Sequence, residues 1–191
     1  MHEWLCRYND PYNTMTQNCI QFHSEVAEKH GKFIKMLLQC AKACHDSGQS
    51  SDIFCMWLIM ASYHRAIHLL EALFILQCVP TALSDLETYC IDNWHKAEYR
   101  RDHLLQKHTS SAIQQAFKSL RRLAFHVENF PNCGMDDFGA GYDAVTDFER
   151  TKVIVLDGHL AKIENAILPE LKNIGTIVSW ITLLIICSLK H

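Results

Sequence analysis

The chain is poor in glycine and proline, with 7 Gly and 4 Pro among 191 residues. Average usage of the two together is about 12%, roughly twice the share found here. So few turn-forming residues argue against a sandwich of many short strands and against a Pro/Gly-rich disordered chain. With 49% hydrophobic and 20% charged residues, the chain has the material for a sizeable core. Composition therefore predicts long helices joined by few loops.

Several motifs of enzymes and of targeting signals are also missing. The sequence has no Gly-rich phosphate loop, no zinc-protease motif and no strand-turn-helix pattern of a dinucleotide site. The N-terminal residues 1–7 do not combine a basic start with an apolar run, so we expect no secretory signal. We also expect neither a metal nor another cofactor.

Neither sign of charge dominates, since 18 Lys and Arg stand against 21 Asp and Glu, a net charge of −3 with neutral histidine. This balance argues against a wholly basic nucleic-acid coat and leaves room for a local basic patch. The 12 histidines add positive charge below neutral pH. The 9 cysteines are odd in number and scattered, which favours reduced core thiols in the cytoplasm over a disulfide framework.

Hydrophobic periodicity predicts an all-α fold, an antiparallel bundle of four or five helices in one domain. We expect a lead-in at 1–15, the bundle at 16–171 and a hydrophobic C-terminal stretch at 172–191. The expected helices start near Thr16, at the Ser50–Asp52 cap, at the Ser84 capping box, at Thr109 and near Tyr142. Only Arg65 and Glu71 are charged between Ile53 and Leu76, which predicts that the second helix is central.

The C-terminal stretch contains seventeen consecutive uncharged residues, 173–189. This length is at the lower limit for crossing a bilayer, and flanking lysines with an internal Trp180 are compatible with a tail anchor. The alternative is a short buried element that packs on the bundle. The chain is accordingly expected in the cytoplasm or, alternatively, attached to a membrane through this tail.

The second helix carries Trp57, Tyr63-His64, Ala66-Ile-His68 and Glu71-Ala72 in that order. This order resembles the signature helix of the HEPN superfamily (higher eukaryotes and prokaryotes nucleotide-binding). Residues 27–37, 95–100 and 116–122 look like the first, third and fourth helices of that family, so the resemblance covers about residues 24–170. It implies a four-helix bundle, a homodimer, and RNA or a nucleotide as ligand. In prokaryotes it also implies a toxin-antitoxin setting with a nucleotidyltransferase partner.

Catalytic members of that superfamily are metal-independent ribonucleases with an Arg-x4–6-His motif, and Arg121 and His126 have this spacing. The imidazole would move protons at a ribose 2′-hydroxyl, and the guanidinium would hold the scissile phosphate. Arg122 stands where the family often has a small polar residue, and related branches lack the catalytic pair. Two interpretations remain open: a metal-independent endoribonuclease, and a protein that binds RNA or nucleotide without cleaving it.

A basic stretch lies between His95 and Arg122, where seven basic side chains against two acidic ones give a net charge of +5. The seven are Lys96, Arg100, Arg101, Lys107, Lys118, Arg121 and Arg122. A basic face beside Tyr99 and Phe125 suits a phosphate backbone, so we predict that Arg100, Arg101, Lys118 and Arg122 contact RNA or nucleotide. The alternative is a solvated surface balanced by acidic neighbours.

His64 and His68 are four residues apart, so a helix places both on one face. One interpretation is a polar pocket in which Tyr63 and His64 bind nucleotide or RNA; a second is a structural role in hydrogen bonds to neighbouring helices. A third interpretation is a metal site, although the glutamate of the zinc-protease motif does not follow His64. Cys40 and Cys44 also share a helix face, which core packing explains better than a zinc site. The alternative function is a non-catalytic helical module that docks on a nucleotidyltransferase or a membrane-associated protein.

Overall fold

The computed structural model describes residues 14–78, 94–128 and 147–172, and every regular element within these ranges is helical. The elements are α1 (Thr14–Asp46), α2 (Asp52–Cys78), α4 (Trp94–His108), α5 (Ser111–Glu128), α7 (Phe148–Thr151) and the π-helix η2 (Lys152–Leu160), followed by α-helical residues 161–172. The predicted all-α class is confirmed. The predicted helix starts at Ser84 and Tyr142 and the C-terminal stretch 173–191 lie outside the described residues.

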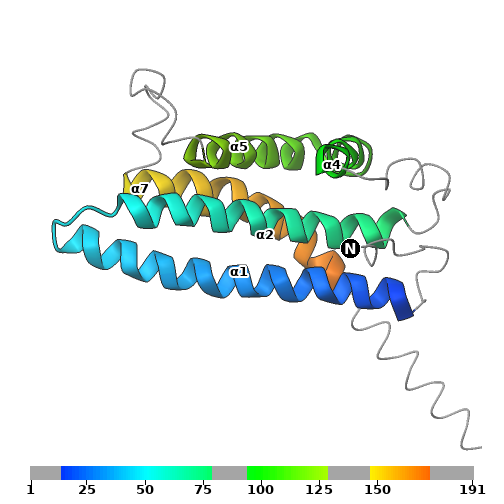
Figure 1. Cartoon of the computed structure of the whole chain (residues 1–191), viewed down its shortest axis with the longest axis horizontal. Helices are drawn as coiled ribbons and strands as arrows, with labels where there is room; N and C mark the ends of the chain where they lie inside the picture. Colours follow the sequence, from blue (N-terminus) through cyan, green and yellow to red (C-terminus); the bar gives the residue numbers. More distant parts are fainter. Residues whose placement is uncertain (1–13, 79–93, 129–146, 173–191) are drawn as a thin grey trace, which may run out of the picture.

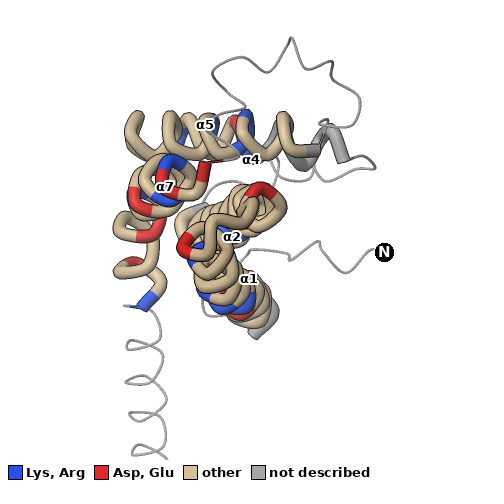
Figure 2. Tube along the Cα trace, turned by 90° about the vertical axis from the view of Figure 1, so that its left-hand side faces the viewer, with Lys and Arg blue, Asp and Glu red and all other residues tan. Residues whose placement is uncertain are grey.

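Helix α2 is central, as predicted, because it contacts all the other labelled elements. Helices α1 and α5 run antiparallel to α2, whereas the helical segment 148–172 runs in the same direction as α2 (Figure 1). Helix α4 is seen nearly end-on in that view, so it crosses the other helices instead of continuing the antiparallel order. Viewed nearly along α1 and α2, helices α4 and α5 form a layer over α2, with α1 on the opposite side (Figure 2).

The core follows the predicted apolar stripes of the helices. Its buried side chains include Ala27, Ile34, Leu37 and Ala41 of α1 and Ala116, Phe117, Leu120 and Ala124 of α5. Helix α2 is buried on several sides between these two stripes, as expected of a helix with almost no charged residues. Among the described helices, α2 alone is long and apolar enough, by length and composition, to cross a membrane. In this structure it is the core helix.

Short polar segments end α1 and begin α5. Gly48 has a φ of +70°, a conformation that glycine adopts without steric cost. The backbone N–H groups of Gly48 and Gln49 donate to the carbonyls of His45 and Cys44, which satisfies the last turn of α1. At the start of α5, the backbone N–H of Ile113 donates to the Ser110 hydroxyl at 3.5 Å. The start of α5 agrees with the helix start near Thr109 predicted from sequence.

The segment that follows α7 differs from the α-helix predicted there. In the π-helix η2 each backbone hydrogen bond spans one residue more than in an α-helix. A Cβ added at Gly158 would lie 2.9 Å from the carbonyl oxygen of Val153, closer than real Cβ contacts. Glycine therefore fits this widened turn. Apolar periodicity could not distinguish the two helix types, because both bury one stripe.

Arg65 of α2 joins three helical segments. Its guanidinium donates to the carbonyl oxygen of Ala27 on α1 and to the carboxylate of Glu164 in the 161–172 helix. The Arg65 side chain is only 13% exposed, so these bonds lie away from bulk water. Gly31 of α1 makes room for it, because a Cβ at Gly31 would fall on the guanidinium.

Replacing Gly31 with alanine should therefore lower the free energy of unfolding by about 1–2 kcal/mol. Alanine in a helix interior is normally worth up to about 1 kcal/mol over glycine. Here the methyl group displaces Arg65 from a charge-assisted bond worth about 1.5–3 kcal/mol, which outweighs that gain. Urea denaturation followed by circular dichroism measures the change. In an Arg65→Met background the same Gly31→Ala substitution should become stabilising; a loss that persists there would show that Arg65 is not the obstacle.

The cysteines do not all behave as predicted. Cys40, Cys44 and Cys55 are free thiols, and burial raises the pKa of Cys55. Cys19 near the start of α1 is disulfide-bonded, so the prediction of nine reduced thiols is wrong at this residue. A disulfide depends on which cysteines the fold brings together, which sequence alone does not show. Disulfides are typical of oxidising compartments, so the cysteines no longer favour the cytoplasm. Cytoplasmic localisation stays a prediction.

Candidate functional site

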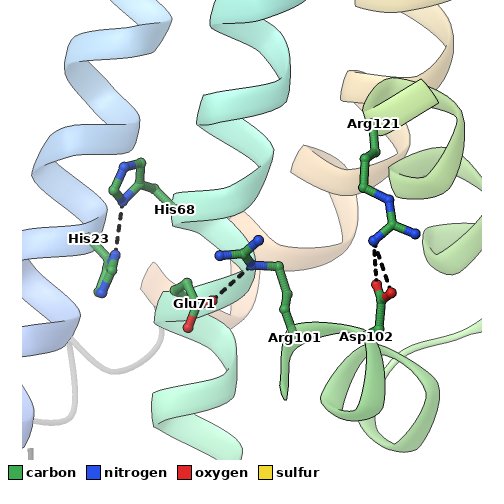
Figure 3. Close-up of polar contacts among 6 residues, drawn as sticks. All are labelled: His23, His68, Glu71, Arg101, Asp102 and Arg121. Atoms are coloured by element: carbon green, nitrogen blue, oxygen red, sulfur yellow. Dashed lines mark hydrogen bonds and ion pairs between the residues drawn. The ribbon is translucent and has the colours of Figure 1, made fainter. Parts of the chain in front are cut away.

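Arg101 of α4 pairs with a carboxylate of the core. Its Nε donates to Oε1 of Glu71 on α2 at 2.9 Å, and the two side chains are 11% and 7% exposed (Figure 3). Arg101 therefore lies at a buried helix contact and not on the outer basic face expected from sequence. The net charge of +5 included Arg101 as if it could bind phosphate, because its acceptor, Glu71, lies on another helix and outside the basic stretch.

Arg121 of α5 also has an acidic partner. Its Nη1 donates to both carboxylate oxygens of Asp102 on α4, at 2.8 and 2.9 Å (Figure 3). The pair is partly exposed, with side chains 29% and 34% accessible. A carboxylate and a phosphate are both oxyanions that a guanidinium binds with parallel hydrogen bonds. Asp102 thus occupies the kind of ligand position that a phosphate would need.

His126 is half-buried in the last turn of α5. The ring of His126 lies edge-on to that of Phe125, with centroids 6.2 Å apart. His126 lies five positions after Arg121, which corresponds to about 140° around the helix axis and about 7.5 Å along it. Within one chain, the side chains of Arg121 and His126 therefore leave α5 on different faces. The helix itself does not bring them together.

Exposed residues of α5 form an outer stripe, which we define as Gln115, Lys118, Arg122 and Phe125. Their spacing of three, four and three residues places them on one helix face, and all four are exposed. Phe125 is 59% exposed, unusual for a large aromatic side chain. Two of the four predicted basic contacts, Lys118 and Arg122, thus lie on this stripe. Arg100 belongs to α4, but its side chain lies outside the described part of the chain.

Tyr63 and His64 of α2 lie in different surroundings from the outer stripe. The ring of Tyr63 packs between His64 and the core ring of Phe117, with centroid distances of 5.8 and 5.7 Å. Both predicted residues are half-buried, and Tyr63 packs against the hydrophobic core. The structure therefore separates Tyr63 and His64, at helix contacts, from Lys118 and Arg122, on the outside of α5.

Four imidazoles form a row between α1 and α2, which we call the histidine ladder: His64, His30, His68 and His23. His30 stacks on His64 and on His68, with ring centroids 5.7 and 5.9 Å apart. His23 and His68 follow, with their Nδ1 atoms 2.9 Å apart, a hydrogen-bond distance (Figure 3). The prediction that the histidines of α2 hydrogen-bond to a neighbouring helix is confirmed for His68. Sequence reasoning missed the partners on α1, His23 and His30. Their spacing of two helical turns, which places both on one helix face, could have indicated them.

Burial favours the neutral form of the ladder. Desolvation, followed by the neighbouring His23, His30 and His64, lowers the pKa of His68 to about 4, although Glu71 acts in the opposite direction. Desolvation, with His64 and Arg65, also lowers the pKa of His30. Both shifts favour the neutral form of His30 and His68 at neutral pH, and a neutral His68 can share one proton with His23 across their hydrogen bond.

Metal binding finds no support in the described ranges, where no group of three or more His, Cys, Asp or Glu side chains is arranged to hold a metal ion. The ladder rings lie side by side along the helices and do not converge on one point. Cys40 and Cys44 of α1 are half-buried, and their upstream neighbours His23 and His30 face α2.

Comparisons with protein-family models, with curated proteins and with solved structures found no match for this chain. Three features of the described residues bear on its function: the outer stripe of α5, the Arg121–Asp102 pair and the histidine ladder.

Proposed function

We propose that this chain is a HEPN-like helical protein that binds RNA, and that the outer stripe of α5 is its contact surface. The observation that carries the proposal is the exposure of Phe125 next to Lys118 and Arg122 on one helix face. Lysine and arginine attract phosphates, while an exposed aromatic ring offers a stacking surface for an unpaired base. Single-stranded RNA fits this combination better than a duplex, whose bases are already stacked on each other.

Binding of a fluorescently labelled single-stranded RNA, measured by anisotropy at several salt concentrations, tests the proposal. The Phe125→Ala variant should bind about tenfold more weakly, because stacking of one base is worth about 1–3 kcal/mol. The double variant Lys118→Gln/Arg122→Gln should reduce the slope of log affinity against log salt by about 1.4, since each phosphate contact to a single strand contributes about 0.7.

The matched control is the double variant Lys29→Gln/Lys35→Gln, which removes the same charge from exposed positions of α1. It should leave the salt slope nearly unchanged. An equal loss in both double variants would show general attraction to the whole surface, and no measurable binding at low salt would contradict the RNA-binding proposal itself.

Cleavage is the extension of this proposal, with Arg121 and His126 as the catalytic pair and a homodimer as the active form. It is supported by the spacing of the two residues and by the oxyanion that Arg121 already holds, Asp102. Incubating RNA with the protein in EDTA should yield products that His126→Ala abolishes, and light scattering should show a dimer. Unchanged cleavage by His126→Ala would contradict its role, and a stable monomer would contradict the composite site.

A second candidate function is docking of a protein partner. It is supported by exposed apolar residues on α1 and α2. Met36, Ile53 and Trp57 are 50%, 57% and 52% exposed. The antiparallel pairing that stacks His30 on His64 brings Met36 to about the level of Trp57, because each lies about two turns closer to the connecting loop. Exposed large apolar residues that lie close together mark protein contacts. A nucleotidyltransferase is the partner that the HEPN resemblance favours.

A further inference from the structure

The histidine ladder occupies the contact between the two longest described helices, α1 and α2. Each ring contacts the next one along the row. The shortest contact is the hydrogen bond between Nδ1 of His23 and Nδ1 of His68. That bond requires one protonated and one unprotonated Nδ1. When both rings are cationic, two N–H groups and two positive charges face each other at 2.9 Å, so the bond is lost.

We propose that the ladder is an acid-operated latch between α1 and α2, closed while His23 and His68 share a proton and opened when both rings of this pair are protonated. Opening separates the first half of α1 from α2, while the layer of α4 and α5 stays packed on the other side of α2. This regulatory role does not depend on the RNA-binding proposal, because the outer stripe of α5 lies on a different helix.

The charged surroundings of the ladder set the sign of the response. On α2, Arg65 lies beside His30 and Glu71 near His68. Arg101 of α4 pairs with Glu71, and Glu164 of the 161–172 helix pairs with Arg65. Each of these charges is thus engaged with an opposite one. Among the described residues, the carboxylates named here are already paired with arginines, so protons added to neighbouring rings of the ladder repel one another.

The direction of the pH effect follows from the two states of His68. Its pKa is about 4 in the folded protein, against about 6.5 in an unfolded chain. As pH falls, the open or unfolded form therefore takes up protons first. The stabilisation is complete above about pH 6.5 and is lost progressively as pH falls towards 4.

Hydrogen exchange of the intact protein at pH 7.5 and 5.5, corrected for intrinsic rates, tests the latch. For His68 the two pKa values predict that opening becomes roughly tenfold more frequent at pH 5.5. Amides of residues 20–30 in α1 should lose protection by about this factor, whereas the amides of α5 should change much less. The His68→Gln variant should show little of this acid effect, and His45→Gln, at an exposed histidine of α1, should retain it.

Two results would overturn the proposal: an equal loss of protection in α1 and α5, or an acid response that His68→Gln leaves intact. If His68→Gln does not fold, NMR titration of the wild-type histidines gives the answer. The pKa of His68 should then be about 4 and that of His30 below its ordinary value, and ordinary titration of both near pH 6.5 would contradict a latch.

Discussion

Replacing Arg101 with methionine should lower the free energy of unfolding by about 3–5 kcal/mol. The substitution keeps an apolar side chain of similar length but removes the guanidinium that lies 2.9 Å from Glu71. The carboxylate of Glu71 is 7% exposed, so water cannot replace the lost donor without opening the contact between α2 and α4. Urea denaturation at pH 7.5, with circular dichroism at 222 nm, measures the loss.

The double variant Glu71→Met/Arg101→Met separates the two possible causes of that loss. When both charges are removed, Glu71 no longer places a buried carboxylate at this contact, and stability should return to within about 1 kcal/mol of the wild type or exceed it. A double variant as unstable as Arg101→Met would mean that the packing volume of the arginine, and not its charge, holds α4. A loss below about 1 kcal/mol in the single variant would mean that the pair is effectively solvated.

Replacing Phe117 with alanine should lower the free energy of unfolding by a similar amount, about 3–5 kcal/mol. The ring of Phe117 is fully buried on α5 and packs on Tyr63 of α2. Its removal leaves a cavity where α5 meets the central helix, and the lost transfer energy adds to the cost of that cavity. The same denaturation measurement applies, and the slope against urea should remain unchanged if the variant still unfolds in two states.

Phe125→Ala is the matched control, since it removes the same side chain from the same helix at a 59% exposed position. Stability should change by no more than about 0.5 kcal/mol. If the RNA proposal holds, this control weakens RNA binding, whereas Phe117→Ala weakens the fold. Equal destabilisation by the two variants would show that Phe125 packs against the protein and would weaken its assignment as a stacking surface.

Periodicity along single helices was enough to predict the buried stripes of α1 and α5. Phe117 lies on the apolar stripe of α5, and Ala27 on that of α1, because burial of a helix face repeats every three to four residues. The central position of α2 followed from its shortage of charges. These features depend on neighbours within one element, and for that reason they can be derived before the helices are placed in space.

The candidate sites were harder to predict because they depend on partners from other helices. Summing charge over the basic stretch could not show that Arg101 bonds to Glu71, thirty residues earlier in the chain. His23 and His68 are forty-five residues apart, and the register between α1 and α2 decides whether their rings meet. The outer stripe was easier, since Lys118, Arg122 and Phe125 belong to one helix face.

The π-helix η2 determines the rotational phase of the helix that follows it. Each of its turns closes over one residue more than an α-helical turn, so the chain winds less per residue between Lys152 and Leu160. A continuous α-helix would turn by about 100° per residue and would deliver the later positions at a different azimuth. Because η2 turns less per residue, Ile163 and Ile167 enter the core and Glu164 pairs with Arg65. The nine residues of η2 thus determine which side chains of the last described helix face the core.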